Sequence, residues 1–222
     1  MTKDEILKEL KKNANPKNVL GMKHFGIQGK NMLGISVTFL RKFAKKISKD
    51  HKLALELWNT GIHEVKMLAS MIDIVDMVSE KQMNKWVSDF DSWDICDGAC
   101  MNLLCKTPFV DKKIYEYAKS EKEFIRRTAF TLIACLSFKK KEWKDKDFIK
   151  YFDLIEEYSF DERNFVKKAV NWALRQIGKR NAKLNVKAIK VAERIKKQGT
   201  KSARWIASNA LSELTKVTKF KM

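Results

Sequence analysis

The feature of this sequence that most constrains its fold is the spacing of its apolar residues, which recur every three or four positions along nearly the whole chain. That period places apolar side chains on one face of an α-helix, whereas a half-buried strand would alternate. Only Pro16, Pro108 and eight glycines interrupt the 222 residues, which is sparse for a sheet protein built on tight turns. The sequence therefore predicts an all-α fold.

Twelve helices are expected from this pattern. They span residues 4–13, 36–49, 51–60, 63–77, 80–90, 92–105, 111–119, 121–137, 144–158, 162–179, 184–197 and 201–215. Ser36 and Ser79 are predicted N-caps, and Gln82 stands at capping-box spacing from Ser79. Four of the eight glycines lie within residues 21–34, which predicts a flexible or tightly turned loop there.

A faint internal repeat favours a stack of helical pairs over an irregular bundle. Five helices align by a basic or polar position near their starts, at residues 63, 92, 124, 165 and 201. The separations of 29, 32, 41 and 36 residues bracket the repeat lengths of helical solenoids such as HEAT arrays. We expect one domain over residues 1–222, with these five helices lining a concave face.

Composition limits the cellular setting. The chain is 45% hydrophobic and 33% charged, which excludes a disordered chain. No apolar run approaches the roughly 20 residues of a membrane span. The N-terminal MTKDEILKELKKN has the pattern of an amphipathic helix and not of a signal peptide. We therefore expect a cytoplasmic protein without a membrane partner.

The net charge of +19 is concentrated at one end of the sequence. Residues 163–222 hold 17 Lys and Arg against Glu193 and Glu213, whereas eight acids outnumber three lysines between Glu64 and Asp97. One-sided basicity of this size favours a polyanion as partner, most simply nucleic acid. A generally lysine-rich proteome is the alternative explanation.

The four cysteines give no sign of metal or redox chemistry. Cys96, Cys100 and Cys105 are four and five residues apart, which is helix-face spacing, and Cys135 stands alone. We expect buried, reduced thiols and no metal site. Local sequence shows neither a complete phosphate-binding loop nor a Cys–His or Ser–His arrangement.

The helix expected over 162–179 separates an apolar arc from a basic one. The apolar arc contains Val166, Ala169, Val170, Ala173, Leu174 and Ile177. Trp172 falls on the opposite side among Lys168, Arg175 and Lys179. An indole among cations can stack on a sugar or base while its neighbours hold phosphates. A tryptophan packed on an adjoining helix beneath snorkelling lysines would give the same pattern.

Two further helices carry one candidate residue each. Arg127 is expected to project from the helix over 121–137, opposite its core face, beside Thr128 and Thr131, which leave room for a phosphate. A surface arginine without a role would look the same. Trp93 and Asp97 are neighbours at i and i+4 on the helix over 92–105, so Asp97 adjoins an apolar stripe. Such a carboxylate either makes a structural pair or does electrostatic work.

Three segments together resemble a known family. FDSWDICD (90–97), EFIRRTAF (123–130) and DERNFVKKAVNWALRQIGKRN (161–181) are similar to the AlkD-like DNA alkylation repair family, and the similarity extends from about Leu33 to Leu214. The resemblance implies a right-handed α-solenoid of HEAT-like helical pairs whose basic concave face grips double-stranded DNA. It also implies a monofunctional glycosylase that excises cationic N3- or N7-alkylpurines without a cofactor.

By this resemblance Asp97, Trp93 and Trp172 would be the catalytic residues. Arg127 and Arg175 match basic positions of the family motif, and Lys168, Lys179 and Arg204 complete the expected DNA-binding set. The sequence departs from active members at Ser92, where they carry a second tryptophan, and at Phe25, where they place an aromatic hydroxyl. We expect a monomer that binds duplex DNA, alkylated in the glycosylase interpretation.

Two alternatives to the glycosylase stay open at this stage. A non-catalytic solenoid could bind damaged, bent or branched DNA through the same basic faces. A HEAT-type scaffold could instead dock an acidic protein partner, because fold does not imply function.

Overall fold

The computed structural model describes residues 1–29 and 31–217, in which helices joined by short turns make up nearly all of the secondary structure. The chain forms two compact units, residues 1–109 and residues 110–222. The single domain over 1–222, the right-handed path and the concave face concern the whole chain and stay predictions.

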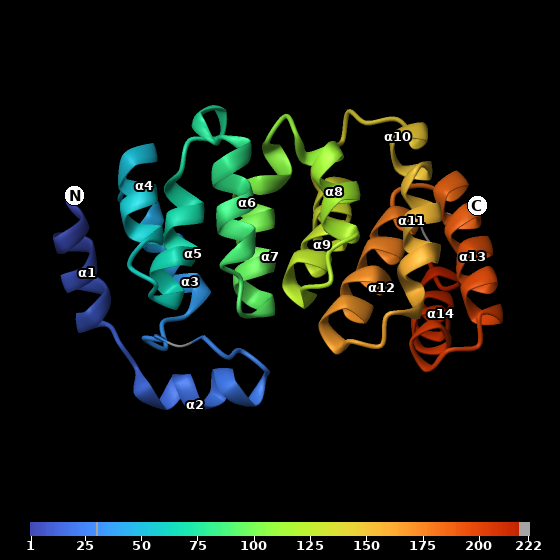
Figure 1. Ribbon diagram of the computed structural model, residues 1–222, viewed down its shortest axis with the longest axis horizontal. Coiled ribbons are helices and arrows are strands. Elements are labelled where there is room, and N and C mark those ends of the chain that lie inside the picture. Colours follow the sequence, from blue (N-terminus) through green and yellow to red (C-terminus); the bar gives the residue numbers. More distant parts are fainter. Residues whose placement is uncertain (30, 218–222) are drawn as a thin grey trace. The chain divides into compact units, whose positions relative to one another are not determined.

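Unit 1 (residues 1–109) stacks short helices in chain order (Figure 1). Its α-helices are α1 (Lys3–Lys12), α2 (Pro16–His24), α3 (Val37–Ala44), α4 (His51–Trp58), α5 (His63–Ile72), α6 (Glu80–Ser88) and α7 (Trp93–Asn102). Two 3₁₀ turns follow α5 and α7, η1 (Val75–Met77) and η2 (Leu104–Lys106). Helix α5 is the centre of the unit, because α3, α4 and α7 all pack on it.

Unit 2 (residues 110–222) is also built from packed helices. They are α8 (Val110–Ala118), α9 (Glu123–Lys139), α10 (Asp145–Ile149), α11 (Tyr151–Glu157), η3 (Tyr158–Phe160), α12 (Asn164–Gly178), α13 (Ala182–Lys197) and α14 (Lys201–Leu214). The longest are α9, α12, α13 and α14. Helix α12 packs on α9, α13 and α14. The predicted all-α repeat of packed helices is therefore confirmed within each unit.

The sequence pattern located most of the helices but missed one and joined others. Residues 16–24 form α2, where no helix was predicted and where residues 21–24 belong to the predicted loop. Asn15 caps this helix by accepting from the backbone N–H groups of Lys17 and Asn18, and Pro16 starts it. The helix predicted over 144–158 is broken at Lys150 into α10 and α11, and the helix predicted over 63–77 ends at Ile72, before η1. Short helices and breaks between them are features for which periodicity is a weak signal.

The two predicted N-caps are confirmed, but the Gln82 side chain has a different partner from the one that a capping box requires. Ser36 and Ser79 accept hydrogen bonds from the backbone N–H groups of Phe39 and Gln82. The Gln82 side chain does not turn back toward the Ser79 backbone, as a capping box requires. It donates instead to the buried carboxylate of Asp73 at 2.6 Å. A tertiary hydrogen bond thus replaces the local one.

The core of unit 2 follows the predicted apolar arc on α12. Its six residues, Val166, Ala169, Val170, Ala173, Leu174 and Ile177, are all fully buried. The predicted division of α9 into a core face and an open face is wrong, because Thr128, Thr131 and Ala134 are also fully buried. Helix α9 is enclosed on all sides, which periodicity cannot distinguish from an amphipathic helix when the second face carries small residues. The four cysteines are buried thiols, as predicted.

The chain between α2 and α3 is fixed to α5 by one carboxylate. Glu64, in the first turn of α5, accepts backbone N–H bonds from Leu33 at 2.8 Å, Gly34 at 2.7 Å and Ile35 at 3.3 Å. The Leu33 and Gly34 carbonyls in turn accept from the Asn15 backbone N–H and the Asn18 amide. Glu64 therefore holds α2 through the segment that follows it, although α2 buries no residue of its own.

Gly34 is required at this junction. Its φ is +74°, and a Cβ built there would lie 2.1 Å from the Asn15 carbonyl oxygen. Gly34→Ala should therefore lower the free energy of unfolding by more than about 1 kcal/mol, which denaturant titration would measure. Gly21→Ala is the matched control, because a Cβ at this α2 position meets nothing within 4 Å and alanine favours a helix. Equal losses in the two variants would contradict this account of Gly34.

Candidate functional site

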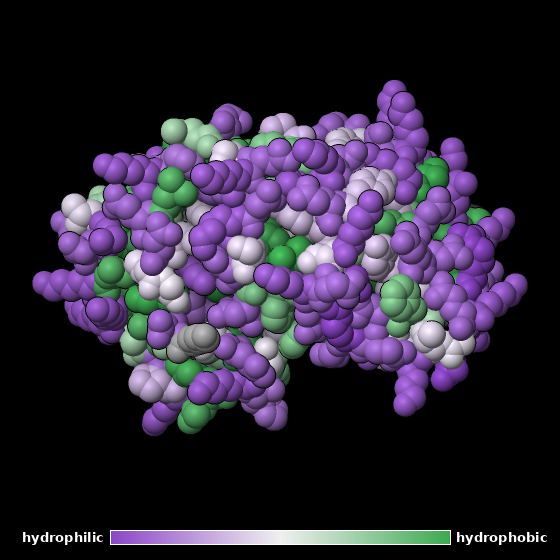
Figure 2. Space-filling view, viewed as in Figure 1, coloured by the Kyte–Doolittle hydropathy of each residue, from purple (hydrophilic) through white to green (hydrophobic). Residues whose placement is uncertain are grey.

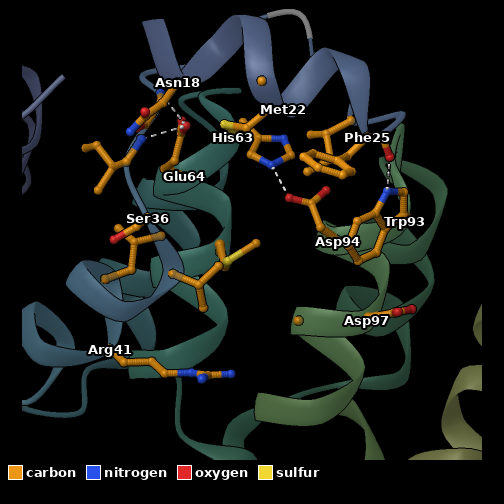
Figure 3. A pocket seen from close by; sticks show the side chains of 18 of the residues that line it. Asn18, Met22, Phe25, Ser36, Arg41, His63, Glu64, Trp93, Asp94 and Asp97 are labelled. Carbon is orange, nitrogen blue, oxygen red and sulfur yellow. Dashed lines mark hydrogen bonds and ion pairs between the residues drawn. The ribbon is translucent and has the colours of Figure 1, made fainter. Parts of the chain in front are cut away.

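Trp93 and Asp97 lie on one face of α7, as their spacing predicted, and both border a pocket of unit 1 (Figure 3). Helix α7 begins at Trp93, directly after the buried Ser92. The indole N–H of Trp93 donates to the Phe25 carbonyl oxygen at 3.1 Å. Trp93 therefore ties the end of α2 to the start of α7, a role that the sequence did not suggest.

The pocket lies beneath α2 and has a volume of about 570 Å³. Its walls come from α2, α3, α5, α7 and the segment that joins α2 to α3. Much of the lining is apolar, with thioethers from Met22, Met67, Met71 and Met101. Met side chains adapt to irregular shapes, so this wall can accommodate a flat group without a fixed fit. Exposed Arg41 adds a cation at α3.

A buried histidine–carboxylate pair crosses the pocket wall from α5 to α7. His63 Nε2 lies 2.7 Å from Asp94 Oδ2, and His63 is only 2% exposed. Asp94 also accepts a hydrogen bond from the Ser92 hydroxyl. Asp94 thus points toward His63, whereas Asp97 extends from the other side of α7 (Figure 3).

The contact between His63 and Asp94 shifts the pKa of each side chain. Burial alone would lower the pKa of His63, but the hydrogen bond and charge of Asp94, with the charges of Glu64 and Asp91, outweigh burial and raise it. Burial alone would raise the pKa of Asp94, but the hydrogen bond and charge of His63 and the Ser92 hydroxyl lower it. Both shifts favour the charged forms of His63 and Asp94 at the start of α5 and α7.

Asp97 is partly exposed and keeps its place among the pocket-lining residues. In Figure 3 its side chain extends from α7 on the side away from His63, below Trp93. The carboxylate is therefore separate from the buried His63–Asp94 pair.

Arg127 does not have the open surroundings that were predicted for it. Its side chain is 5% exposed, and its guanidinium donates to the Phe165 carbonyl oxygen at 2.6 Å. The expectation of free space beside Arg127 is wrong, because Thr128 and Thr131 are buried and leave no open face on α9. Its proposed contact with a phosphate stays a prediction.

The basic stripe of α12 is present, but part of its charge is neutralised within unit 2. Arg175 and Lys179 both pair with Glu213 of α14, Lys179 at 2.7 Å. Burial would raise the pKa of Glu213, but hydrogen bonds from Lys179 and Arg175 lower it. Lys168 and Arg204 are exposed. The sequence could not reveal the Glu213 pairs, because they join residues 34 or more positions apart.

Trp172 lies on the basic stripe of α12 and is partly exposed. Its ring lies 6.4 Å from that of Phe138 at the end of α9. The indole N–H donates at 3.0 Å to the Gln176 amide oxygen when that amide is oriented to satisfy both groups. Trp172 therefore combines the two alternatives set out for it, being both packed on a neighbouring helix and partly exposed beside cations.

The predicted site residues fall in both units. Trp93 and Asp97 belong to unit 1, whereas Arg127, Lys168, Trp172, Arg175, Lys179 and Arg204 belong to unit 2. The structure therefore brings together the pair on α7 and, separately, the stripe on α12. Within residues 1–29 and 31–217, no group of three or more His, Cys, Asp or Glu side chains is arranged to hold a metal ion. In the same residues no helix is long and apolar enough to cross a membrane.

Helices that pack on their neighbours in chain order within each unit define a HEAT-like helical-repeat protein. The chain belongs to the DNA alkylation repair enzyme family, whose model matches residues 6–214. This result confirms the resemblance identified in the sequence.

A solved structure supports the same fold. It was reported as one of a new family of proteins related to the HEAT-like repeat DNA glycosylases, with affinity for branched DNA structures. The TM-score is 0.78 at 16% sequence identity, over 94% of this chain and 93% of that chain. Comparison with curated proteins gave no match.

The His63–Asp94 pair predicts a specific pH dependence of stability. The raised pKa of His63 contributes stability that is complete below its ordinary value, about 6.5, and is lost as pH rises through the folded-state pKa. The lowered pKa of Asp94 contributes stability that is complete above 3.8 and is lost as pH falls through the folded-state pKa. The pair should therefore stabilise unit 1 most between these two ordinary values.

Asp94→Asn tests this window. Removing one partner of a buried pair costs roughly 3–5 kcal/mol, and we expect the loss to be larger near pH 5.5 than near pH 8.5. Denaturant unfolding of wild type and variant at the two pH values would measure the difference. Glu56→Gln, at an exposed position of α4, is the control. A loss that is the same at both pH values would contradict the charged pair.

Proposed function

We propose that this chain binds double-stranded DNA and hydrolyses the N-glycosidic bond of cationic N3- or N7-alkylpurines. The observation that carries the proposal is the placement of Trp93 and Asp97 side by side on α7 at the edge of the unit 1 pocket. Membership of the DNA alkylation repair enzyme family supports it. The net charge of +19 supplies the attraction for a polyanion.

The chemistry asks little of the protein. An alkylated purine already carries a positive charge, so it leaves without a strong general acid. What remains is to stabilise the oxocarbenium-like deoxyribose and to place a water. In the proposal Asp97 does both, through its charge and by accepting a hydrogen bond from that water. No cofactor is needed for these steps.

The tryptophans have different parts in this scheme. Trp93 can present its ring face to the developing cation, since its N–H is engaged by the Phe25 carbonyl and fixes the ring. Trp172 remains the second proposed aromatic contact, on a side chain steadied by Phe138. Both assignments follow from the family motif and from the partial exposure of the two rings.

The proposed phosphate contacts are assigned to basic side chains according to how exposed each side chain is. Lys168 and Arg204 are exposed and carry the main part of the proposed DNA contact. Arg175 and Lys179 contribute by exchanging Glu213 for a phosphate. Arg127 is 5% exposed, so its side chain must move before it contacts a phosphate. We propose that a monomer makes these contacts.

A second function is favoured by two observations. Ser92 stands where active members of the resembling family carry a tryptophan, and it is buried and bonded to Asp94. The structural relative was reported to have affinity for branched DNA structures. Both favour a protein that binds branched or damaged DNA without excising a base.

Base release from duplex DNA containing N7-methylguanine separates the two functions. We expect wild type to release the base, and Asp97→Asn to lose roughly 10²-fold or more in rate while still binding the same duplex. Asp91→Asn is a matched control, because Asp91 is exposed and lies outside the pocket lining. If wild type binds the DNA but releases no base at high protein excess, the non-catalytic function holds and the glycosylase proposal fails.

A further inference from the structure

Helix α14 exposes a tryptophan that its own packing does not need. The buried side of α14 consists of Ala203, Ile206, Ala207 and Ala210, each fully buried. Trp205 lies outside this set and is 39% exposed, which places it among the most exposed large hydrophobic side chains of the described residues. A large apolar ring left in water at this level calls for an explanation beyond the core.

One cation lies over the Trp205 ring, and others are close to it along α12 and α14. Lys167 Nζ of α12 lies over the ring, 5.4 Å from its centroid. Lys201 precedes Trp205 by one helical turn on the same helix, and Arg204 is its direct neighbour. Lys168, beside Lys167, is also exposed. We call these five residues, Lys167, Lys168, Lys201, Arg204 and Trp205, the Trp205 patch.

The cations of the Trp205 patch are not neutralised by acids in the way the α12 stripe is. Within the part of the chain that the structure describes, none of the four forms an ion pair with a carboxylate. Arg204 donates to the Gly199 carbonyl oxygen, which leaves its charge uncompensated. The nearby carboxylate of Glu162 accepts the backbone N–H of Ser202 at 3.0 Å. Positive charge and an aromatic face thus coincide at one surface.

We propose that the Trp205 patch binds an unpaired nucleotide of DNA. The base stacks on the exposed part of the indole, and Lys167, Lys201 and Arg204 contact the adjoining phosphates. Every base has a π-face, so stacking of this kind is tolerant of sequence. Bases inside a duplex are already stacked on each other and cannot use the ring. The patch therefore adds a preference for DNA with a single-stranded flap or bulge.

This inference rests on the proposed DNA binding and goes beyond it in one respect. Attraction by lysines and arginines alone would treat duplex and flapped DNA alike, apart from their charge. Stacking on Trp205 would make a difference between them that depends on one side chain. Trp172 is less suited to this role, because it packs near Phe138 and its neighbours Arg175 and Lys179 are paired with Glu213.

The test compares the Kd for a duplex with the Kd for the same duplex carrying a short single-stranded flap, by fluorescence anisotropy. We expect Trp205→Leu to weaken binding to the flapped DNA by about tenfold and to change binding to the duplex by less than about twofold. Trp205→Phe keeps a stacking ring and should stay close to wild type. Phe160→Leu, which removes another exposed aromatic ring of unit 2, is the control and should change neither Kd.

Two further measurements guard against a change in folding. The melting temperature of each variant is compared with wild type, and Lys167→Gln leaves the ring in place but should weaken binding to both DNAs. Wild-type tryptophan fluorescence should be quenched more by flapped DNA than by duplex, and Trp205→Phe should lose this excess quenching. If Trp205→Leu leaves the ratio of the two Kd values unchanged, the inference is overturned while DNA binding stands. If wild type binds neither DNA at low salt, the proposed function itself fails.

Discussion

The arrangement of unit 1 depends on the buried carboxylate of Glu64. A polar group with 1% exposure is costly unless its hydrogen bonds are satisfied, and here three successive backbone N–H groups donate to Glu64. That single contact fixes the chain after α2, and through Asn15 and Asn18 it fixes α2 as well. Trp93 then holds the other end of α2. The pocket beneath α2 exists because both ends of this helix are tied down.

The same residues explain why Trp93 and Asp97 can be positioned for function without belonging to the core. The first turn of α7 is set by the His63–Asp94 pair and by Ser92. Asp94 is the carboxylate that pairs with His63 at this point. Asp97, one turn further along, is left at the pocket edge. Two carboxylates three residues apart thus have different environments, because Asp94 faces His63 and Asp97 extends from the other side of α7.

Much of the fold was predictable because the apolar period is strong in long helices. The core arc of α12 and the caps at Ser36 and Ser79 follow from local sequence. The apolar period could not identify α2, because the helix buries no residue and shows no apolar stripe. It also misjudged α9, whose second face of small residues is buried and not open. The two errors differ in cause. Helix α2 has no buried face for the period to detect, whereas burial of the second face of α9 is decided by distant parts of the chain.

Of the candidate site, the positions along single helices were predictable and the contacts between distant residues were not. Spacing alone put Trp93 and Asp97 on one face of α7, and the family resemblance supplied their roles. Spacing could not show that Glu213 pairs with Arg175 and Lys179, that Arg127 is buried, or that Asp94 pairs with His63. Counting cations in the sequence therefore overstates how many face the solvent. The exposed positive charge is better represented by the cations of the Trp205 patch, which include Lys168 and Arg204.

The central claim is that this chain grips DNA through exposed cations of unit 2, and the salt dependence of binding tests it most directly. We predict that log Kd for a labelled duplex rises linearly with log salt, and that Lys168→Gln lowers the slope by about 0.9, the contribution of one phosphate contact. Lys183→Gln is a suitable control, because Lys183 of α13 lies near Asp145 of α10 and outside the proposed contact. Absence of binding at low salt, or binding that is indifferent to salt, would contradict the account.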